Sequence, residues 1–414
     1  MAGWRKLSPD GPLDVSGGTA GVANRALFVA GFAAFAMLYV AQGTLPTVGT
    51  AFHVSPATSA LTVSLTTLPL ALGVVIAASI SERRGRRGML VGSLVTAAVC
   101  TLVTALSPTF GVLLALRVLT GIGLAALPAV AMAYIAEEVG LGSLGSTMGL
   151  YISATGLGGL AGRLAGGVLA GLFGWQAAFL AVGGAALLGS LYVALRLPPS
   201  RNFVSQPERL LPQIAAARVH LRDGVLLRLY VCGFALMGAM VAFFNFLLYR
   251  LEAPPFDLAA SSAALVFLLY LAGTVSANWL GRLAARRSLR TLLLLAVAIM
   301  LAGVLLSLSR SLPVVLVATG LVTFGFFGAH STASGWVGAR ATVRRAQASS
   351  LYLLFYHLGS SLLGFVGGLA YGGGQWPGLV LLVAASVAIA LFAASRLPSV
   401  RSDASLPGAL AAEP

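Results

Sequence analysis

Charged residues are scarce in this chain of 414 residues, at 9% of the total. A soluble domain carries about 25% charged residues, so a chain of this composition cannot cover a water-facing surface. Hydrophobic residues make up 58% and recur in long apolar runs from one end of the chain to the other. Because roughly 20 apolar residues in a helix span the hydrocarbon core of a bilayer, the composition predicts an integral membrane protein.

The sequence also lacks the motifs of several kinds of functional site. Cys100 and Cys232 lie in separate apolar runs without metal-ligand spacing, so we expect free thiols and no metal site. The chain has no G-x-x-x-x-G-K-[ST] loop, which excludes ATP as the direct energy source. It also has no cluster of histidines and acids like that of a membrane enzyme. We therefore expect a protein that is not an enzyme and needs no cofactor.

The net charge of +15 does not indicate nucleic acid, because the arginines sit in short loops between apolar runs. We expect no nucleic-acid partner. Length and loop signals predict twelve transmembrane helices. The expected spans are 26–45, 59–80, 89–107, 110–136, 145–172, 175–195, 225–249, 259–280, 289–308, 312–336, 347–371 and 377–395.

The distribution of lysines and arginines along the chain tests the prediction of twelve spans. All but four of the 26 lysines and arginines fall in the tails and alternate loops of one side. Arg250 and Arg310 fall on the other side, and Arg117 and Arg163 fall within spans. Cytosolic loops carry such an excess, so we expect both termini in the cytosol of a bacterial inner membrane.

The longest polar stretch divides the twelve spans into six and six. The expected organisation is a cytosolic N-terminal tail, a six-helix bundle, a cytosolic linker, a second six-helix bundle and a cytosolic C-terminal tail. Their boundaries are 1–25, 26–195, 196–224, 225–395 and 396–414, in that order.

An internal repeat relates the two halves. A shift of 201 residues places Tyr151 on Tyr352 and Trp175 on Trp376 in one ungapped register, together with Gly158, Gly166 and Gly167 on Gly359, Gly367 and Gly368. The repeat predicts an all-α membrane fold of two pseudo-symmetric six-helix bundles. Secondary transporters with parallel repeats place the substrate site near mid-membrane between the halves, so the architecture favours transport by alternating access.

The loop after the second span reads SERRGRR at 81–87. It resembles the signature loop of the major facilitator superfamily, G-x-x-x-D-R-x-G-R-R, with Ala78 in place of the first glycine and Glu82 in place of the aspartate. The resemblance implies a gating latch made by Glu82, Arg83, Gly85, Arg86 and Arg87. An alternative from the residues alone is an ordinary positively charged cytosolic loop, in which Glu82 pairs with Arg86 or caps a helix.

Arg117 lies within the fourth span, where an ionised side chain is costly and normally faces a cavity or a partner. With Gly121 and Gly123 it resembles the second superfamily signature, R-x-x-Q-G-x-G, with Thr120 at the glutamine position. The resemblance implies a role in proton coupling by tuning a neighbouring acid. Snorkelling of Arg117 to the outer interface is the alternative.

The fifth span contains GLGGLAGRLAGGVLAG at 156–171. Gly158, Gly162, Gly166 and Gly167 predict a ridge of small residues for close helix packing. They resemble the superfamily's antiporter signature, G-x-x-x-G-P-x-x-G-G, with Arg163 at the proline position. We expect a partner such as a backbone carbonyl or a cavity group to hold Arg163. The chain from the first to the eleventh span is similar to the YnfM-type branch of drug and metabolite exporters within the superfamily.

None of the eleven acids lies in the middle of a predicted span. This absence leaves His330 and His357 as the titratable candidates for proton coupling, with Glu137 at the inner end of the fourth span as another. Coupling to something other than protons is the alternative. Arg117 and Arg163 are further coupling candidates. Each histidine has an alternative role as a neutral group bonded to a neighbouring helix.

Substrate contacts follow from the superfamily plan and from helical spacing. The candidates are Tyr39, Gln42, Asn245, Tyr249, Tyr352 and Tyr356, each of which is equally consistent with an interhelical hydrogen bond. Sparse polar groups among aromatic rings suit a partly apolar small molecule. We expect a monomeric exporter of a small organic molecule (drug, sugar or metabolite) in exchange for protons. A facilitator or importer with the same fold is the alternative, and a membrane scaffold is disfavoured.

Overall fold

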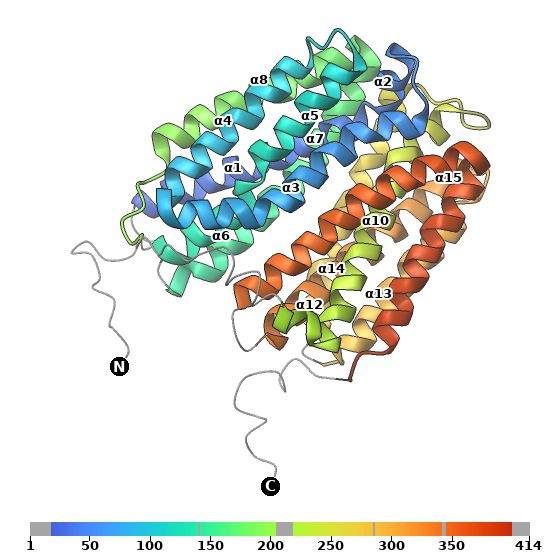
Figure 1. Cartoon of the computed structure of the whole chain (residues 1–414). Coiled ribbons are helices and arrows are strands. Elements are labelled where there is room, and N and C mark those ends of the chain that lie inside the picture. Colours follow the sequence, from blue (N-terminus) through green and yellow to red (C-terminus); the bar gives the residue numbers. More distant parts are fainter. Residues whose placement is uncertain (1–17, 140, 204–217, 285, 342–344, 400–414) are drawn as a thin grey trace.

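In the computed structural model, the described residues are 18–139, 141–203, 218–284, 286–341 and 345–399, and they form two bundles of long helices lying side by side (Figure 1). This part of the chain contains no strand. The all-α membrane fold predicted from the sequence is confirmed. The remaining residues, including most of both predicted tails, lie outside the described part.

The first bundle contains α1 (Gly18–Gly43), α2 (Leu45–Ala51), α3 (Pro56–Arg84), α4 (Arg86–Thr104), α5 (Phe110–Leu124), α6 (Ala126–Glu138), α7 (Leu141–Phe173) and α8 (Trp175–Arg196). The second contains α10 (Gly224–Glu252), α11 (Ala260–Ala263), η1 (Ala264–Tyr270), α12 (Leu271–Leu283), α13 (Leu289–Leu306), α14 (Leu312–Arg340) and α15 (Arg345–Ser395).

Within the described residues, eleven helical segments are long and apolar enough to cross a membrane. The last, in α15, is too long for one pass, because 51 residues of helix extend about 75 Å and a hydrocarbon core is about 30 Å thick. At Gln375 the backbone leaves the helical region, with φ 52°. There α15 folds back into two antiparallel arms (Figure 1). The spans predicted at 347–371 and 377–395 are both present, giving twelve passes.

The glycine ridge of α7 lies directly against α1. A Cβ atom on Gly158, Gly162 or Gly166 would overlap the backbone of Phe32, Ala36 or Val40, respectively. Close backbone approach of this kind is how helices associate in a membrane, where burial of apolar surface drives them together weakly. The ridge therefore fixes α7 on α1.

The second half repeats this packing, as the sequence register predicts. Tyr151 packs on Gly31 between α7 and α1, and Tyr352 packs on Gly233 between α15 and α10. Gly359 meets the backbone of Phe234 as Gly158 meets that of Phe32. The pseudo-symmetry therefore extends to individual contacts.

The α3–α4 and α12–α13 turns lie at one end of the molecule, here called the arginine-rich end because the turns carry Arg83, Arg86, Arg87, Arg286 and Arg287. The two halves touch each other at the opposite end, here called the far end. At the far end, a Cβ on Gly167 would contact Ala264 and one on Gly368 would contact Ala57. Small residues thus allow α7 to approach η1, and α15 to approach α3.

The ridge makes a prediction about stability. Gly162→Ala should destabilise the protein by about 1–3 kcal/mol, because its Cβ meets rigid backbone of α1. Gly156 on the same helix faces open space, so Gly156→Ala should be neutral or stabilising, since alanine favours helix by about 1 kcal/mol over glycine. Thermal unfolding in detergent measures both variants. Equal unfolding temperatures for the two would contradict the ridge.

Candidate functional site

Arg163 lies at the centre of the bundle and is only 4% exposed. Its Nε donates to Oε1 of Gln42 at 2.5 Å, and its Nη1 donates to the carbonyl oxygen of Gly159 at 2.8 Å. The guanidinium carbon is 3.5 Å from the ring centre of Tyr39 and 4.4 Å from that of Tyr270. Arg163, which the sequence predicts to need a partner, therefore donates to these two acceptors and lies close to two aromatic rings.

A short relay joins this arginine to the second half. Nε2 of Gln42 donates to Oδ1 of Asn245 at 2.7 Å and lies 3.4 Å from the carbonyl oxygen of Val241. Both amide side chains are fully buried. The predicted substrate contacts Gln42 and Asn245 therefore pair with each other across the interface between the halves.

An aromatic group on α14 and α15 completes the site. Nδ1 of His330 is 2.9 Å from the hydroxyl oxygen of Tyr352, and its ring centre is 4.7 Å from that of Tyr356. Phe326 stacks on His330, and Phe327 connects this group to Tyr270. Together these form what we call the central cluster: Tyr39, Gln42, Arg163, Asn245, Tyr270, Phe326, Phe327, His330, Tyr352 and Tyr356.

His357 lies beside the cluster. It is 3% exposed, and its ring meets that of Tyr356 edge-on at 5.1 Å. Among the described residues no hydrogen-bond partner reaches its Nδ1. The two predicted coupling histidines are thus near each other: His330 belongs to the central cluster, and His357 contacts it through Tyr356.

The positive charge of Arg163 has no carboxylate beside it in the described part of the chain, where its contacts are an amide oxygen, a backbone carbonyl and two rings. The acids whose side chains are described all lie at or beyond helix ends: Glu137, Glu138, Asp223, Glu252 and Asp257. The cluster therefore combines a fixed cation with neutral donors, acceptors and rings.

Arg117 does not snorkel to the membrane surface. It is fully buried, and it donates to the carbonyl oxygens of Thr62 at 3.2 Å, Met37 at 3.2 Å and Leu38 at 3.0 Å. Its guanidinium also lies over the ring of Phe179 at 5.6 Å. These contacts tie α5 to α1, α3 and α8. Since each acceptor is a backbone carbonyl, the geometry favours a structural role over tuning of a neighbouring acid.

Arg86 at the arginine-rich end pairs with Glu137 at 2.7 Å and donates to the Ser81 hydroxyl at 2.5 Å. Arg87 donates to the carbonyl oxygen of Ala194 at 2.7 Å. Side-chain contacts of Glu82 lie outside the described part, so the latch implied for it is not tested. Glu137, a coupling candidate from the sequence, is thus the ion-pair partner of Arg86 near the end of α6, and it is not part of the central cluster.

Asp223 makes the corresponding link in the second half. It caps α10 through the backbone amides of Val225 and Leu226 and accepts from Arg340 at 3.0 Å. Partial burial acts to raise the pKa of this carboxyl, but the two amides and Arg340 outweigh it and lower the pKa. The pair joins α10 to the end of α14.

Tyr249 lies outside the central cluster. Its hydroxyl is 2.8 Å from that of Ser59 and donates to the carbonyl oxygen of Leu45 at 2.8 Å, so it joins α10 to α2 and α3 at the far end. Tyr270, Phe326 and Phe327 were not predicted as site residues. The only sequence signal for them was an aromatic ring within an apolar span.

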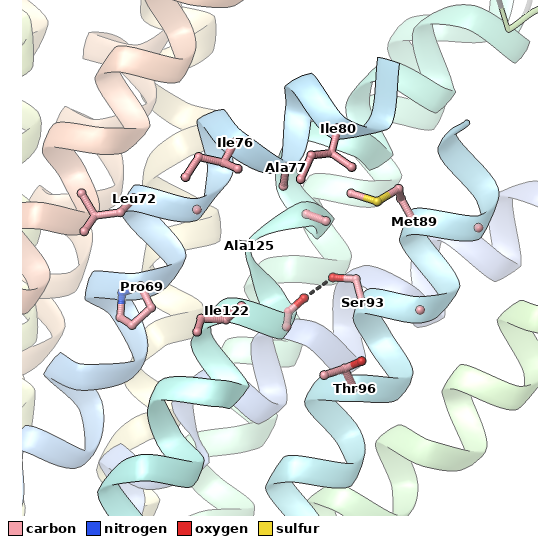
Figure 2. A pocket seen from close by; sticks show the side chains of 15 residues that line it. Pro69, Leu72, Ile76, Ala77, Ile80, Met89, Ser93, Thr96, Ile122 and Ala125 are labelled. Atoms are coloured by element: carbon pink, nitrogen blue, oxygen red, sulfur yellow. Dashed lines mark hydrogen bonds between the residues drawn. The ribbon is translucent and has the colours of Figure 1, made fainter. Parts of the chain in front are cut away.

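An apolar groove of about 800 Å³ lies between α3, α4 and the α5–α6 bend (Figure 2). Leu72, Ile76, Ile80 and Ile122 on its wall are 39–56% exposed. Figure 2 shows the Ser93 hydroxyl directed at the backbone of α5, where it donates to the carbonyl of Gly123. No lining residue belongs to the central cluster, and such an open apolar surface suits lipid chains.

The contacts of Arg117 generate a test of its role. Arg117→Leu should lower stability by about 1.5–3 kcal/mol or more, because buried carbonyls of α1 and α3 lose a charged donor. Arg310→Leu, at an exposed site, is the matched control and should unfold like the parent protein. Thermal unfolding in detergent distinguishes them. Normal stability of Arg117→Leu with loss of proton coupling alone would support a coupling role instead.

Comparison with known proteins agrees with this architecture. The family model of the major facilitator superfamily matches residues 27–342. The chain is 40% identical over 367 residues to YybF, an uncharacterized MFS-type transporter of Bacillus subtilis, covering 89% of this chain and 91% of YybF. It is 38% identical over 374 residues to the inner membrane transport protein YnfM of Escherichia coli, covering 90% of this chain and 89% of YnfM.

Among solved structures, a bacterial homologue of the human lysosomal transporter Spinster, in an inward-facing and occupied conformation, shares the fold. Its TM-score is 0.73 at 19% identity, over 91% of this chain and 95% of that chain. The chain belongs to the major facilitator superfamily and is a multi-pass membrane transporter of small molecules.

Proposed function

We propose that the chain exports a small organic molecule across the bacterial inner membrane in exchange for protons, by exposing the central cluster alternately to either side. The observation that carries this proposal is the composition of the cluster. Arg163, Tyr39 and Gln42 come from the first half, and Asn245, Tyr270 and His330 come from the second. A rocking motion of the halves must break the Gln42–Asn245 hydrogen bond and separate Arg163 from Tyr270.

His330 is the proposed proton-binding group. Histidine is the side chain whose charge changes near neutral pH. In the tautomer whose Nδ1 is unprotonated, a proton added there converts that nitrogen from an acceptor to a donor, and the Tyr352 hydroxyl then accepts instead of donating. The added charge also lies beside the ring of Tyr356, which His330 contacts at a tilt. His357 is the second proposed site.

The glycine motif of α7 supports the direction of transport. The antiporter positions of the superfamily motif are occupied by Gly158, Gly162, Gly166 and Gly167. These glycines keep α7, which carries Arg163, packed closely against α1. The charge pattern of the loops supports cytosolic termini, with the arginine-rich end facing the cytosol. We propose a monomer as the transporting unit, because the cluster is complete within one chain.

A second candidate is inward co-transport of substrate and proton. The observation that favours it is the uncompensated positive charge of Arg163. If the substrate is an anion, its charge offsets the repulsion between Arg163 and a protonated His330. Proton and substrate would then bind together, which drives co-transport, whereas exchange requires them to compete.

Proteoliposome transport with an imposed pH gradient decides between the candidates. A panel of neutral, cationic and anionic aromatic compounds is offered outside the vesicles. Exchange predicts accumulation into an acidic lumen, because protons leave as substrate enters. Co-transport predicts accumulation into an alkaline lumen. Flux indifferent to the gradient in both directions would contradict proton coupling altogether.

The role of His330 is tested in the same assay. His330→Gln keeps a hydrogen-bonding side chain that cannot titrate, so gradient-driven flux should fall to the rate seen without a gradient. Substrate counterflow, which needs no proton, should remain. His53→Gln at an exposed position is the control and should behave like the parent protein. Full gradient response in His330→Gln and in the His330→Gln, His357→Gln double variant would refute histidine coupling.

A further inference from the structure

We infer that Arg163 is the anchor of an anion-binding site, and that the transported molecule is an aromatic or similarly apolar organic anion such as a carboxylate or sulfonate. This inference rests on the proposed transport through the central cluster. The anion site itself does not depend on the direction of transport, whereas the proton-linked binding that follows from it is the behaviour of the co-transport candidate and not of exchange. It names the chemistry of the ligand from the charge, the donors and the rings that surround Arg163.

The charge of Arg163 is the first argument. A guanidinium group removed from water loses several kcal/mol of solvation, and neutral acceptors restore only part of it. In the described residues Arg163 is 4% exposed, and its hydrogen-bond partners are the Gln42 amide, the Gly159 carbonyl and the Tyr39 hydroxyl, all of them neutral. An anionic ligand would supply the missing negative charge. A cationic ligand would be repelled by the same group.

An excess of donors is the second, independent argument. Arginine carries five N–H donors, and Gln42 and Gly159 accept two of those of Arg163. One hydrogen bond beyond Gln42, the fully buried Nδ2 of Asn245 has no acceptor among the described residues. Buried donors normally have acceptors, so a ligand rich in acceptor oxygens fits this site better than one rich in donors.

The rings determine the body of the ligand. The rings of Tyr39 and Tyr270 both lie close to the Arg163 guanidinium, and Phe327 and Tyr356 extend the aromatic surface toward His330. Planar guanidinium groups bind carboxylates through two parallel hydrogen bonds. A flat anion can therefore bind Arg163 with its charged end and stack its ring on the neighbouring aromatic side chains.

Proton binding follows from this assignment. A positive charge on His330 adds to that of Arg163, and a bound anion reduces the repulsion between them. An anion should therefore bind more tightly as His330 becomes protonated, and binding should weaken as the pH rises. The groups that face His330 are Tyr352, Tyr356 and Phe326, with His357 nearby, and none of these is an acid.

The test uses four probes of similar shape and different charge on the purified full chain in detergent. Benzoate and benzenesulfonate are anions, benzamide is neutral and benzylamine is a cation. Isothermal titration should show binding of both anions, with benzamide about 10–100-fold weaker, as expected for loss of a charged hydrogen bond. Benzenesulfonate stays ionised throughout, so its weakening at higher pH reports titration of the protein. Equal binding of benzoate and benzamide by the parent protein would overturn the inference.

Variants then locate the site. Arg163→Gln should remove the preference for benzoate over benzamide, and Arg163→Lys should retain it because the charge remains. Arg250→Gln is the matched control, since Arg250 also lies between a backbone carbonyl and aromatic rings but at the far end of the second half. It should keep the preference. An undiminished preference in Arg163→Gln would contradict the assignment, and if that variant does not fold, the probe series on the parent protein and Arg163→Lys still decides it.

The binding assay separates this inference from the proposed function. It contains no membrane and no gradient, so anion-selective binding stands even where transport proves independent of protons. Conversely, gradient-driven transport of a neutral or cationic compound, with no binding of benzoate or benzenesulfonate, would leave the proposed function intact and refute the anion site.

Discussion

The buried guanidinium group of Arg163 constrains most of what surrounds it. A cation held away from water needs acceptors, and this one finds them on its own helix and on α1, with a ring from each half of the protein on its faces. Gln42 in turn donates a hydrogen bond to Asn245 of the second half. The same interaction therefore links the two halves and sets the charge of the site between them.

Close packing makes this arrangement possible. The glycines of α7 bring its backbone against that of α1, so the side chains of Arg163 and Gln42 start from helices in direct contact. Apolar burial alone would not hold these helices together in a bilayer, where lipid chains are as apolar as leucine. A second arginine, Arg117, reinforces α1 from the other side through backbone carbonyls. The contacts of Arg117 are thus with backbone carbonyls within the first half, whereas those of Arg163 extend through Gln42 and Tyr270 to the second half.

The sequence predicts the fold well because spans, loop charges and the repeat are properties of consecutive residues. The register that relates Tyr151 to Tyr352 predicts equivalent packing, and both rings do pack on a glycine of the neighbouring helix. The glycine spacing likewise predicts a ridge. A 51-residue α15 is interpretable as two spans because apolar length has a physical limit.

Side-chain partners across the bundle could not be predicted in this way. Arg86 pairs with Glu137 on α6, 51 residues further along the chain, because helix ends from distant segments meet there. The sequence leaves Tyr249 open as a substrate contact or an interhelical hydrogen bond, and only the structure shows the hydrogen bonds by which it joins α10 to α2 and α3. In the sequence Tyr270 is only one aromatic residue within an apolar span, since its place in the cluster comes from the position of η1 beside α7 and not from its own neighbours in the chain.

The central claim is that Arg163 carries an uncompensated charge that a substrate anion neutralises between the halves. Electron cryo-microscopy of the chain in lipid nanodiscs with benzenesulfonate tests it most directly. The account predicts sulfonate density against the Arg163 guanidinium, with the ring among Tyr39, Tyr270 and Tyr356. Density for the anion elsewhere, or an Arg163 side chain paired with a carboxylate of the protein, would contradict it.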